Sequence, residues 1–256
     1  FFGCPAEETI GGKVYMAEAG LFKGYEAALI IHPGGENEVG GTSLATHPLE
    51  VTFHGRSCHI ASLTDSGINA LDCAVELYQK IKELKKTFPK GAIVGAIFTE
   101  AGTAPNVVTP KATIRMTVRG STVDDLEGII LPAIKAAAQE IAASYGAQVE
   151  MHHYEPLFKD MRQDKRLLDL FKAVMTEFGE VPRILPDDEA DGSTDVGNVS
   201  YEVPTAQPTL QIGLGLEAHT PEFTCAAGSD YGLAQAIKGA KIMAVVALRY
   251  ALLSDT

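Results

Sequence analysis

Between about Thr46 and Pro156, apolar and polar residues follow a regular order of strand-like and helix-like patterns. Strand-like alternation or β-branched content marks four segments, at 47–54, 92–102, 112–122 and 147–156. Helical spacing of apolar residues marks two segments, at 67–86 and 123–145. Thr122 is suited to cap the second helix, and Pro132 should kink it or displace its start. The order strand, helix, two strands, helix, strand predicts a ferredoxin-like βαββαβ domain over residues 46–156.

The residues on either side of this region predict an α/β layer. Helices are expected at 12–22, 164–179 and 229–253, and strands at 1–5, 25–33 and 205–215. The two flanks, 1–45 and 157–256, are therefore expected to form one discontinuous domain with a mixed sheet. The predicted fold class is α/β, with this domain interrupted by the βαββαβ domain.

Composition narrows the class of protein further. The chain has 256 residues, is 46% hydrophobic and carries a net charge of −12. That charge argues against nucleic acid or an anionic membrane as a partner. No apolar run approaches the roughly 20 residues that a membrane helix needs. Four scattered cysteines without CxxC spacing are typical of a reducing compartment, so a cytoplasmic protein is expected.

Acidic residues and histidines lie where strands are expected to end. Glu7 and Glu8 follow a short apolar run, and His32 ends the strand at 25–33. Together with His219 they could form a mixed N/O site for a divalent transition metal. The second carboxylate could take a proton from water and pass it to a leaving amine. Alternatively, these are solvated loop acids, a strand-end histidine and a surface histidine.

Several motifs in the same order resemble one enzyme superfamily. They are "PAEE" with the following helix and strand, "HGRSCHIASLTDSGINALD", "NVVTPKATIRMTVR", "GSTDVGNVS" and "AHTPEF". The chain resembles the dinuclear metal-dependent peptidases and amidohydrolases, which include aminoacylase, carboxypeptidase G and p-aminobenzoyl-glutamate hydrolase. The matched motifs extend over nearly the whole chain. In that superfamily the flanking residues form the catalytic domain, and 46–156 would be the dimerisation, or lid, domain.

The resemblance implies a role for each matched residue. Glu7 would be the general base and acid, and His59 would reach the partner subunit's active site to stabilise an oxyanion. Metal ligands are implied at Glu8, His32 and His219, and substrate contacts at Asn106 and Arg119. Two of these residues have a structural alternative: His59 could be a turn histidine, and Arg119 could be a paired cation on the strand surface. Asp195 could either orient the site or a ligand, or cap a loop.

The resemblance also implies the activity and the partners. The expected reaction is metal-dependent hydrolysis of an amide bond in a small N-acyl amino acid, dipeptide or aminobenzoyl-glutamate-like substrate with a free carboxylate. Two divalent ions, Zn or Mn, are expected in the intact enzyme, which would be a homodimer through residues 46–156. The superfamily places further ligands upstream of "PAEE", so a missing N-terminal segment or a companion chain is expected, and this chain alone would be inactive. The alternative is a non-catalytic fragment that serves as a dimerising or ligand-binding module.

Overall fold

The computed structural model describes residues 1–61 and 67–254. The chain forms two compact units. The first unit comprises Phe1–Pro5, Gly12–Ser43 and the residues from Met161 onward. The second unit comprises Ala6–Gly11 and Leu44–Asp160. The acidic segment Ala6–Gly11 therefore groups with the second unit, whereas the sequence assigned it to the first.

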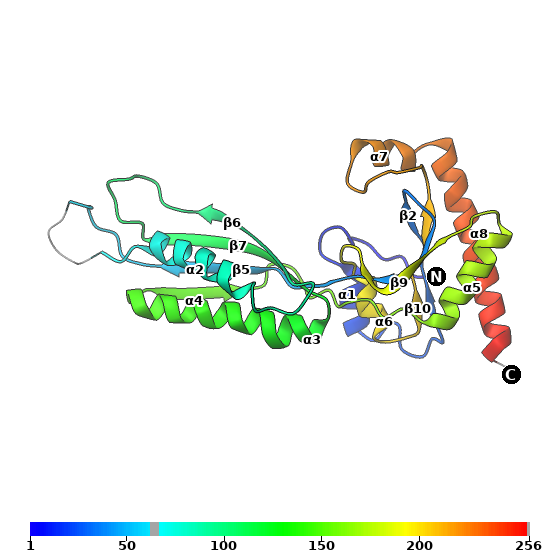
Figure 1. Ribbon diagram of the computed structural model, residues 1–256, viewed down its shortest axis with the longest axis horizontal. Helices are drawn as coiled ribbons and strands as arrows, with labels where there is room; N and C mark the ends of the chain where they lie inside the picture. Colours follow the sequence, from blue (N-terminus) through cyan, green and yellow to red (C-terminus); the bar gives the residue numbers. More distant parts are fainter. Residues whose placement is uncertain (62–66, 255–256) are drawn as a thin grey trace. The chain divides into compact units, whose positions relative to one another are not determined.

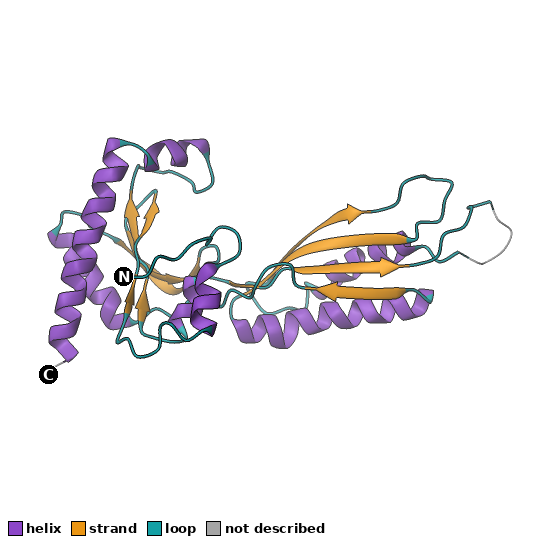
Figure 2. Cartoon of the chain, turned by 180° about the vertical axis from the view of Figure 1, so that it is seen from behind, coloured by secondary structure: helices purple, strands orange, loops and turns teal. Residues whose placement is uncertain are grey.

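The second unit is an antiparallel sheet covered on one face by helices (Figure 1). Its elements are β4 (Ala45–Thr46), β5 (Leu49–His54), α2 (Ala70–Leu84), β6 (Ile93–Glu100), β7 (Lys111–Gly120), α3 (Val123–Asp125), η1 (Leu126–Ile130), α4 (Leu131–Tyr145) and β8 (Gln148–His152). Strand β7 pairs with β4, β5 and β6, and β5 also pairs with β8. Figure 2 shows the helices together on the same side of these strands. The predicted βαββαβ order is confirmed.

Alternation along β5 and β7 builds the core of the second unit. Leu49, Val51 and Phe53 are fully buried on β5. On α2, Leu77 and Ile81 lie one helical turn apart and face the same core. The apolar spacing that predicted these elements is thus the spacing that packs the sheet against its helices. Asn69 caps α2 by accepting a hydrogen bond from the Leu71 amide, at 3.1 Å.

Pro132 lies where the helical hydrogen-bond pattern changes, as expected for a residue without an N–H. It lies in the first turn of α4, directly after the π-helical turn η1. The Leu131 amide there donates to the Leu126 carbonyl, five residues back. Since proline has no N–H, the helix can restart at this point with one fewer amide to satisfy. The hydroxyl of Thr122 accepts from the Asp125 amide at 3.1 Å, which confirms the predicted cap.

The first unit is a mixed sheet with helices. Its elements are α1 (Gly12–Glu18), β1 (Ala28–Leu29), β2 (His32–Gly34), β3 (Glu38–Thr42), α5 (Lys165–Glu177), β9 (Arg183–Ala190), α6 (Val196–Ser200), β10 (Thr205–Ala206), β11 (Thr209–Gln211), α7 (Pro221–Ala227) and α8 (Asp230–Ser254). The four-stranded sheet has the order β2-β11-β3-β9, in which only the β11–β3 pair is antiparallel. The mixed α/β class is therefore confirmed. Across the described residues, no helix is both long and apolar enough to cross a membrane.

Two strand predictions for the first unit need correction. Residues 1–5 form no strand, because the ring of Phe2 packs instead on Phe22 and Tyr25, with centroid separations of 5.1 and 5.3 Å. The long strands expected at 25–33 and 205–215 are each divided in two, as β1 with β2 and β10 with β11. Pro208 lies at the break and has no N–H for the ladder, so pairing resumes at Thr209.

Candidate functional site

Glu7 and Glu8 lie in a sharp turn with a strained entry. The Ala6 carbonyl accepts the amides of Ile10 and Gly11 at 3.1 and 2.8 Å, so the chain folds back within five residues. Ala6 has a φ of 62°, which costs a residue with a Cβ roughly 1–2 kcal/mol. Glu7 is half-buried and Glu8 is exposed. Strain of this kind is commonly retained at functional sites, so the turn is a candidate for one.

A buried ion pair in the first unit fixes the start of helix α1, directly after this turn. The Asp195 carboxylate is fully buried and accepts from the Lys13 backbone amide at 2.9 Å and from its Nζ at 2.7 Å. Lys13 itself is only 6% exposed. The backbone bond satisfies one of the amides that a helix N-terminus leaves without a partner. Asp195 therefore acts as a long-range cap for α1, a role that sequence reasoning could not distinguish from local loop capping.

His32 and His219 both lie in the first unit and are exposed. The Nδ1 atom of His32 lies 2.7 Å from the Pro33 carbonyl. A carbonyl can only accept, so Nδ1 carries the proton, and Nε2 of the neutral ring presents a lone pair. Metal-binding histidines are commonly oriented in this way by a backbone carbonyl. His219 has a φ of 62°, and it and Ala6 are the only described residues other than glycine with a positive φ.

The second unit brings two other candidates, His59 and Asn106, together. The Ile60 amide donates to the Asn106 carbonyl at 3.1 Å, and the Val108 amide donates to the Cys58 carbonyl at 2.9 Å. These bonds pair the segment after β5 with the segment before β7. His59 Nδ1 accepts the Ala61 amide at 3.2 Å, so the neutral ring carries its proton on Nε2. His59 can therefore donate a hydrogen bond from an exposed ring, which is the chemistry that an oxyanion requires.

Arg119 lies far from His59 and Asn106 within the same unit. It is near the end of β7, opposite Thr46 and Ile93, whereas the His59 segment adjoins the beginning of that strand. The eight residue-to-residue steps of antiparallel strand from Lys111 to Arg119 span roughly 27 Å. One small molecule therefore cannot contact both Arg119 and His59 of a single copy. Within the described residues Arg119 forms no ion pair, so its guanidinium is available to a carboxylate.

The described residues do not assemble a metal centre by themselves. Over residues 1–61 and 67–254, no three His, Cys, Asp or Glu side chains gather in a group that could hold a metal ion. His32 and His219 of the first unit therefore form no such group with a third donor among the described residues. The orientation of His32 fits a ligand, but a stable site needs at least three protein donors.

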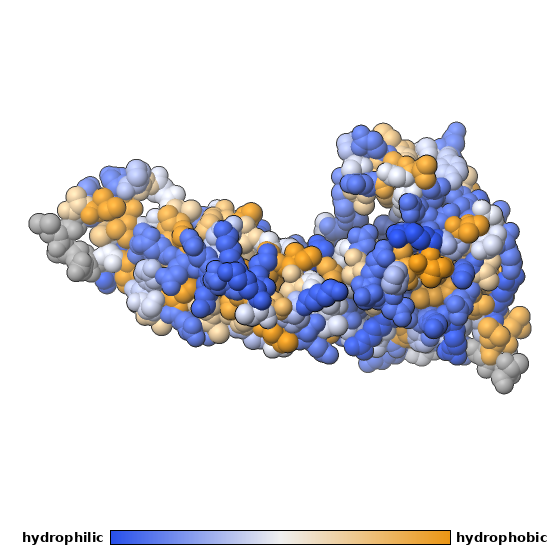
Figure 3. Space-filling view, in the orientation of Figure 1, coloured by the Kyte–Doolittle hydropathy of each residue, from blue (hydrophilic) through white to orange (hydrophobic). Residues whose placement is uncertain are grey.

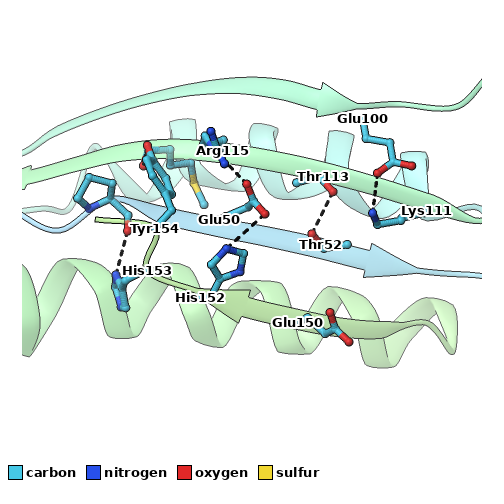
Figure 4. Close-up of polar contacts among 12 residues, drawn as sticks. Glu50, Thr52, Glu100, Lys111, Thr113, Arg115, Glu150, His152, His153 and Tyr154 are labelled. Carbon is cyan, nitrogen blue, oxygen red and sulfur yellow. Dashed lines mark hydrogen bonds and ion pairs between the residues drawn. The ribbon is translucent and has the colours of Figure 1, made fainter. Parts of the chain in front are cut away.

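The open face of the second unit's sheet carries a polar network that the sequence did not reveal (Figure 4). Glu50 accepts from Arg115 Nε at 2.9 Å and lies 3.5 Å from His152 Nε2. The Arg115 guanidinium also covers the Tyr154 ring, 4.4 Å from its centroid. Burial, together with the nearby Glu155 carboxylate, raises the pKa of Tyr154. This face thus combines the Glu50–Arg115 ion pair with the Tyr154 hydroxyl, which stays protonated at neutral pH.

A stacked pair of histidines links the segment before β5 to the segment after β8. The rings of His47 and His153 stack with a centroid separation of 3.4 Å. His153 Nδ1 donates to the Pro48 carbonyl at 3.0 Å, and Nε2 accepts from Lys135 at 2.9 Å. Burial, and then the proximity of His47 and Lys135, lowers the pKa of His153 below its usual 6.5.

This cluster predicts a loss of stability in mild acid. Well above pH 6.5, His153 is neutral in both the folded and the unfolded chain. As the pH falls through 6.5 toward the lower folded-state pKa, the unfolded chain binds a proton that the folded chain resists, so stability decreases. Thermal melts between pH 7.5 and 5.5 should show this decrease, and His153→Asn should reduce its slope. An identical slope in the variant would exclude His153 as the source.

Comparison with known proteins gives the family. Residues 48–146 match the peptidase dimerisation domain of the M20 type. The chain is 30% identical over 249 residues to the mouse Xaa-Arg dipeptidase, covering 96% of this chain and 57% of the mouse protein. It is also 30% identical over 131 residues to a p-aminobenzoyl-glutamate hydrolase chain of Escherichia coli K12, covering 50% of this chain and 27% of that protein.

A solved structure shares the fold of this chain. A putative aminohydrolase from methicillin-resistant Staphylococcus aureus superposes with a TM-score of 0.70 at 16% identity, covering 93% of this chain and 64% of that one. The chain belongs to the M20 peptidase and amidohydrolase superfamily. The chain spans 57% of the length of the mouse dipeptidase.

Proposed function

We propose that the whole protein hydrolyses an amide bond in a small N-acyl amino acid, dipeptide or aminobenzoyl-glutamate-like substrate that bears a free carboxylate. The observation that carries this proposal is the 30% identity to a dipeptidase across 96% of the chain. A second relative, the Bacillus subtilis N-acetylcysteine deacetylase, matches over 86% of the chain and is also named for the cleavage of an amide. Both names describe small substrates.

We assign the proton transfers to Glu7. Its carboxylate would take a proton from the attacking water and return it to the leaving amine, as a single positioned acid–base group can. The strained Ala6 and the short turn hold Glu7 half-buried, which favours a fixed orientation. Superfamily members are metal-dependent. We propose Glu8, His32 and His219 as metal ligands, in a site that needs further donors in addition to these three.

We assign substrate recognition to the second unit. His59 would donate to the developing oxyanion from Nε2, and Asn106 would contact the substrate from the adjacent segment. Arg119 would hold the terminal carboxylate through two parallel hydrogen bonds. The roughly 27 Å along β7 means that His59 and Arg119 of one copy would serve different active sites. A homodimer is therefore part of the proposal.

The alternative function is a non-catalytic dimerising module. The observation that favours it is the edge strand β6, which is paired only with β7 among the described strands. Ile93, Ile97 and Phe98 on this strand are exposed, by 47%, 62% and 38%. Hydrophobic residues line this edge in Figure 3. The opposite edge, β8, exposes Gln148, Glu150 and His152, which discourage pairing. A β6-mediated dimer is compatible with either function.

The test is a substrate pair assayed with the whole protein in its metal-loaded form. We expect hydrolysis of a free-carboxylate dipeptide, and expect Arg119→Met to raise its KM by about 10- to 100-fold, as loss of a charge-assisted contact does. The same dipeptide with a C-terminal carboxamide should be cleaved with a KM that the variant does not change. An equal effect on both substrates would contradict the assignment of Arg119. A dimer in sedimentation that cleaves no amide would favour the module instead.

A further inference from the structure

A cavity in the first unit shares no residue with the candidate catalytic set. Its volume is about 360 Å³, and it lies between strands β3 and β9 and the first two turns of α5. Its glycine wall is held in place: Gln163 Nε2 donates to the carbonyls of Gly40 and Gly41 at 2.6 and 3.0 Å. Gln163 Oε1 in turn accepts the Gln207 amide at 2.9 Å. The cavity is therefore built by specific hydrogen bonds, and its size lies at the small end of ligand pockets.

Helix α5 presents charged residues of both signs to this cavity. Lys165, Leu168, Asp169 and Lys172 have the spacing i, i+3, i+4 and i+7, which places them on one helical face. The spacing would allow Asp169 to pair with either lysine. Nevertheless, none of these three charged side chains forms an ion pair within the described part of the chain. All three are exposed. The helix thus offers separate positive and negative groups on either side of an apolar one.

Strand β9 supplies the opposite wall through an irregularity in the sheet. The β3–β9 register shifts between Gly40 and Thr42, so β9 loops outward after Leu185 and brings Asp187 to the cavity. Such bulges often re-aim side chains beside binding sites. The loop depends on Gly40, whose φ is +105° and where a Cβ would lie 2.6 Å from the Leu185 carbonyl oxygen. The cavity therefore faces an acid and an aliphatic side chain on β9 as well.

The position of Lys165 has no evident benefit for the fold alone. It lies in the first turn of α5, where the positive end of the helix disfavours a cation. Lys165 forms no ion pair among the described residues, and the Asp164 carboxylate that caps this turn lies near Arg166 instead. Lys165 and Lys172 therefore place two positive charges without ion-pair partners on the α5 wall, with Asp169 between them. A bound carboxylate would supply the counter-charge that the two lysine ammonium groups lack.

We propose that this cavity binds a free amino acid with an aliphatic side chain. Lys165 and Lys172 receive the carboxylate, and Asp169 or Asp187 receives the ammonium group. Leu168 and Leu185 line the region for the aliphatic chain, where burial of apolar surface adds affinity. The site is distinct from the proposed catalytic residues and does not depend on the proposed hydrolysis.

Isothermal titration calorimetry of the full chain with three probes tests the proposal. L-Leucine carries all three features, 4-methylpentanoate lacks the ammonium group, and 3-methylbutylamine lacks the carboxylate. We expect leucine to bind at least tenfold more tightly than either analogue. We also expect Lys172→Met to weaken leucine binding at least tenfold, whereas Lys241→Met, an exposed lysine on α8, leaves it unchanged. Both lysines are on the surface, so circular dichroism should show both variants folded.

One further variant separates this site from the proposed catalytic one. Arg119→Met removes the carboxylate contact assigned to the second unit and should leave leucine binding at wild-type strength. Leucine binding that is lost in Arg119→Met and retained in Lys172→Met would overturn the cavity site while supporting the catalytic assignment. An absence of leucine binding to the folded wild-type chain would also overturn it, and would leave the hydrolytic proposal untouched.

Discussion

Glu7→Gln in the whole, metal-loaded protein is expected to lower kcat for amide hydrolysis by about 10²- to 10⁴-fold, the usual contribution of a general acid–base group. Glutamine preserves the size and the hydrogen-bonding reach of the side chain but cannot carry the proton. The substitution should leave KM nearly unchanged, because Glu7 is assigned to proton transfer and not to substrate binding. Steady-state kinetics with a free-carboxylate dipeptide would measure both quantities.

Glu18→Gln is the matched control for this prediction. Glu18 is an exposed acid at the end of α1, so its neutralisation changes the net charge by the same amount without touching the turn. We expect wild-type turnover in this control. Since the backbone bonds that close the turn all involve main-chain atoms of Ala6 and of residues 9–11, Glu7→Gln should retain the native melting temperature. If Glu7→Gln lowers kcat by less than tenfold, then another group carries the proton.

Local signals in the sequence identified the helices well. The segments at 67–86 and 164–179 contain α2 and α5 because their apolar faces repeat at helical spacing and pack on the cores of their units. The strands β3 and β9 were missed. Their residues, EVGGT and RILPDDEA, contain the glycine, proline and aspartate that normally mark turns. These two strands exist because they pair with one another across more than 140 residues, a contact that no local pattern encodes.

The candidate site also has features that the sequence predicted and features that it did not. The paired acids and the strand-end histidine could be singled out by residue type and position, but their backbone strain and ring orientations could not. His59 and Asn106 are 47 positions apart and become neighbours only through pairing of the segments that flank β5 and β7. Arg119 shares a motif with Asn106 in sequence, yet the extended strand carries it to the other end of the sheet. Strand geometry, more than motif order, decides which residues can meet one substrate.

The ion pair between Lys13 and Asp195 is the strongest case of such a distant contact, and its loss should be costly. Asp195→Asn leaves a lysine ammonium 6% exposed and without its counter-charge. Breaking one side of a buried pair typically costs about 3–5 kcal/mol, because the remaining charge stays out of water. Urea denaturation followed by circular dichroism should show this loss of unfolding free energy.

A double variant tests whether the cost comes from the orphaned charge. Lys13→Met combined with Asp195→Asn removes both charges, and the asparagine oxygen can still accept from the backbone amide of residue 13. The double variant should therefore recover most of the stability lost in Asp195→Asn. Glu177→Gln breaks the exposed pair with Arg249, which solvent already screens, and should cost far less. Because α1 begins directly after the Glu7 turn, Asp195→Asn should also reduce kcat, and the double variant should restore it in part. If the double variant is no more stable than Asp195→Asn, then the hydrogen bonds and not the charges account for the contribution of Asp195.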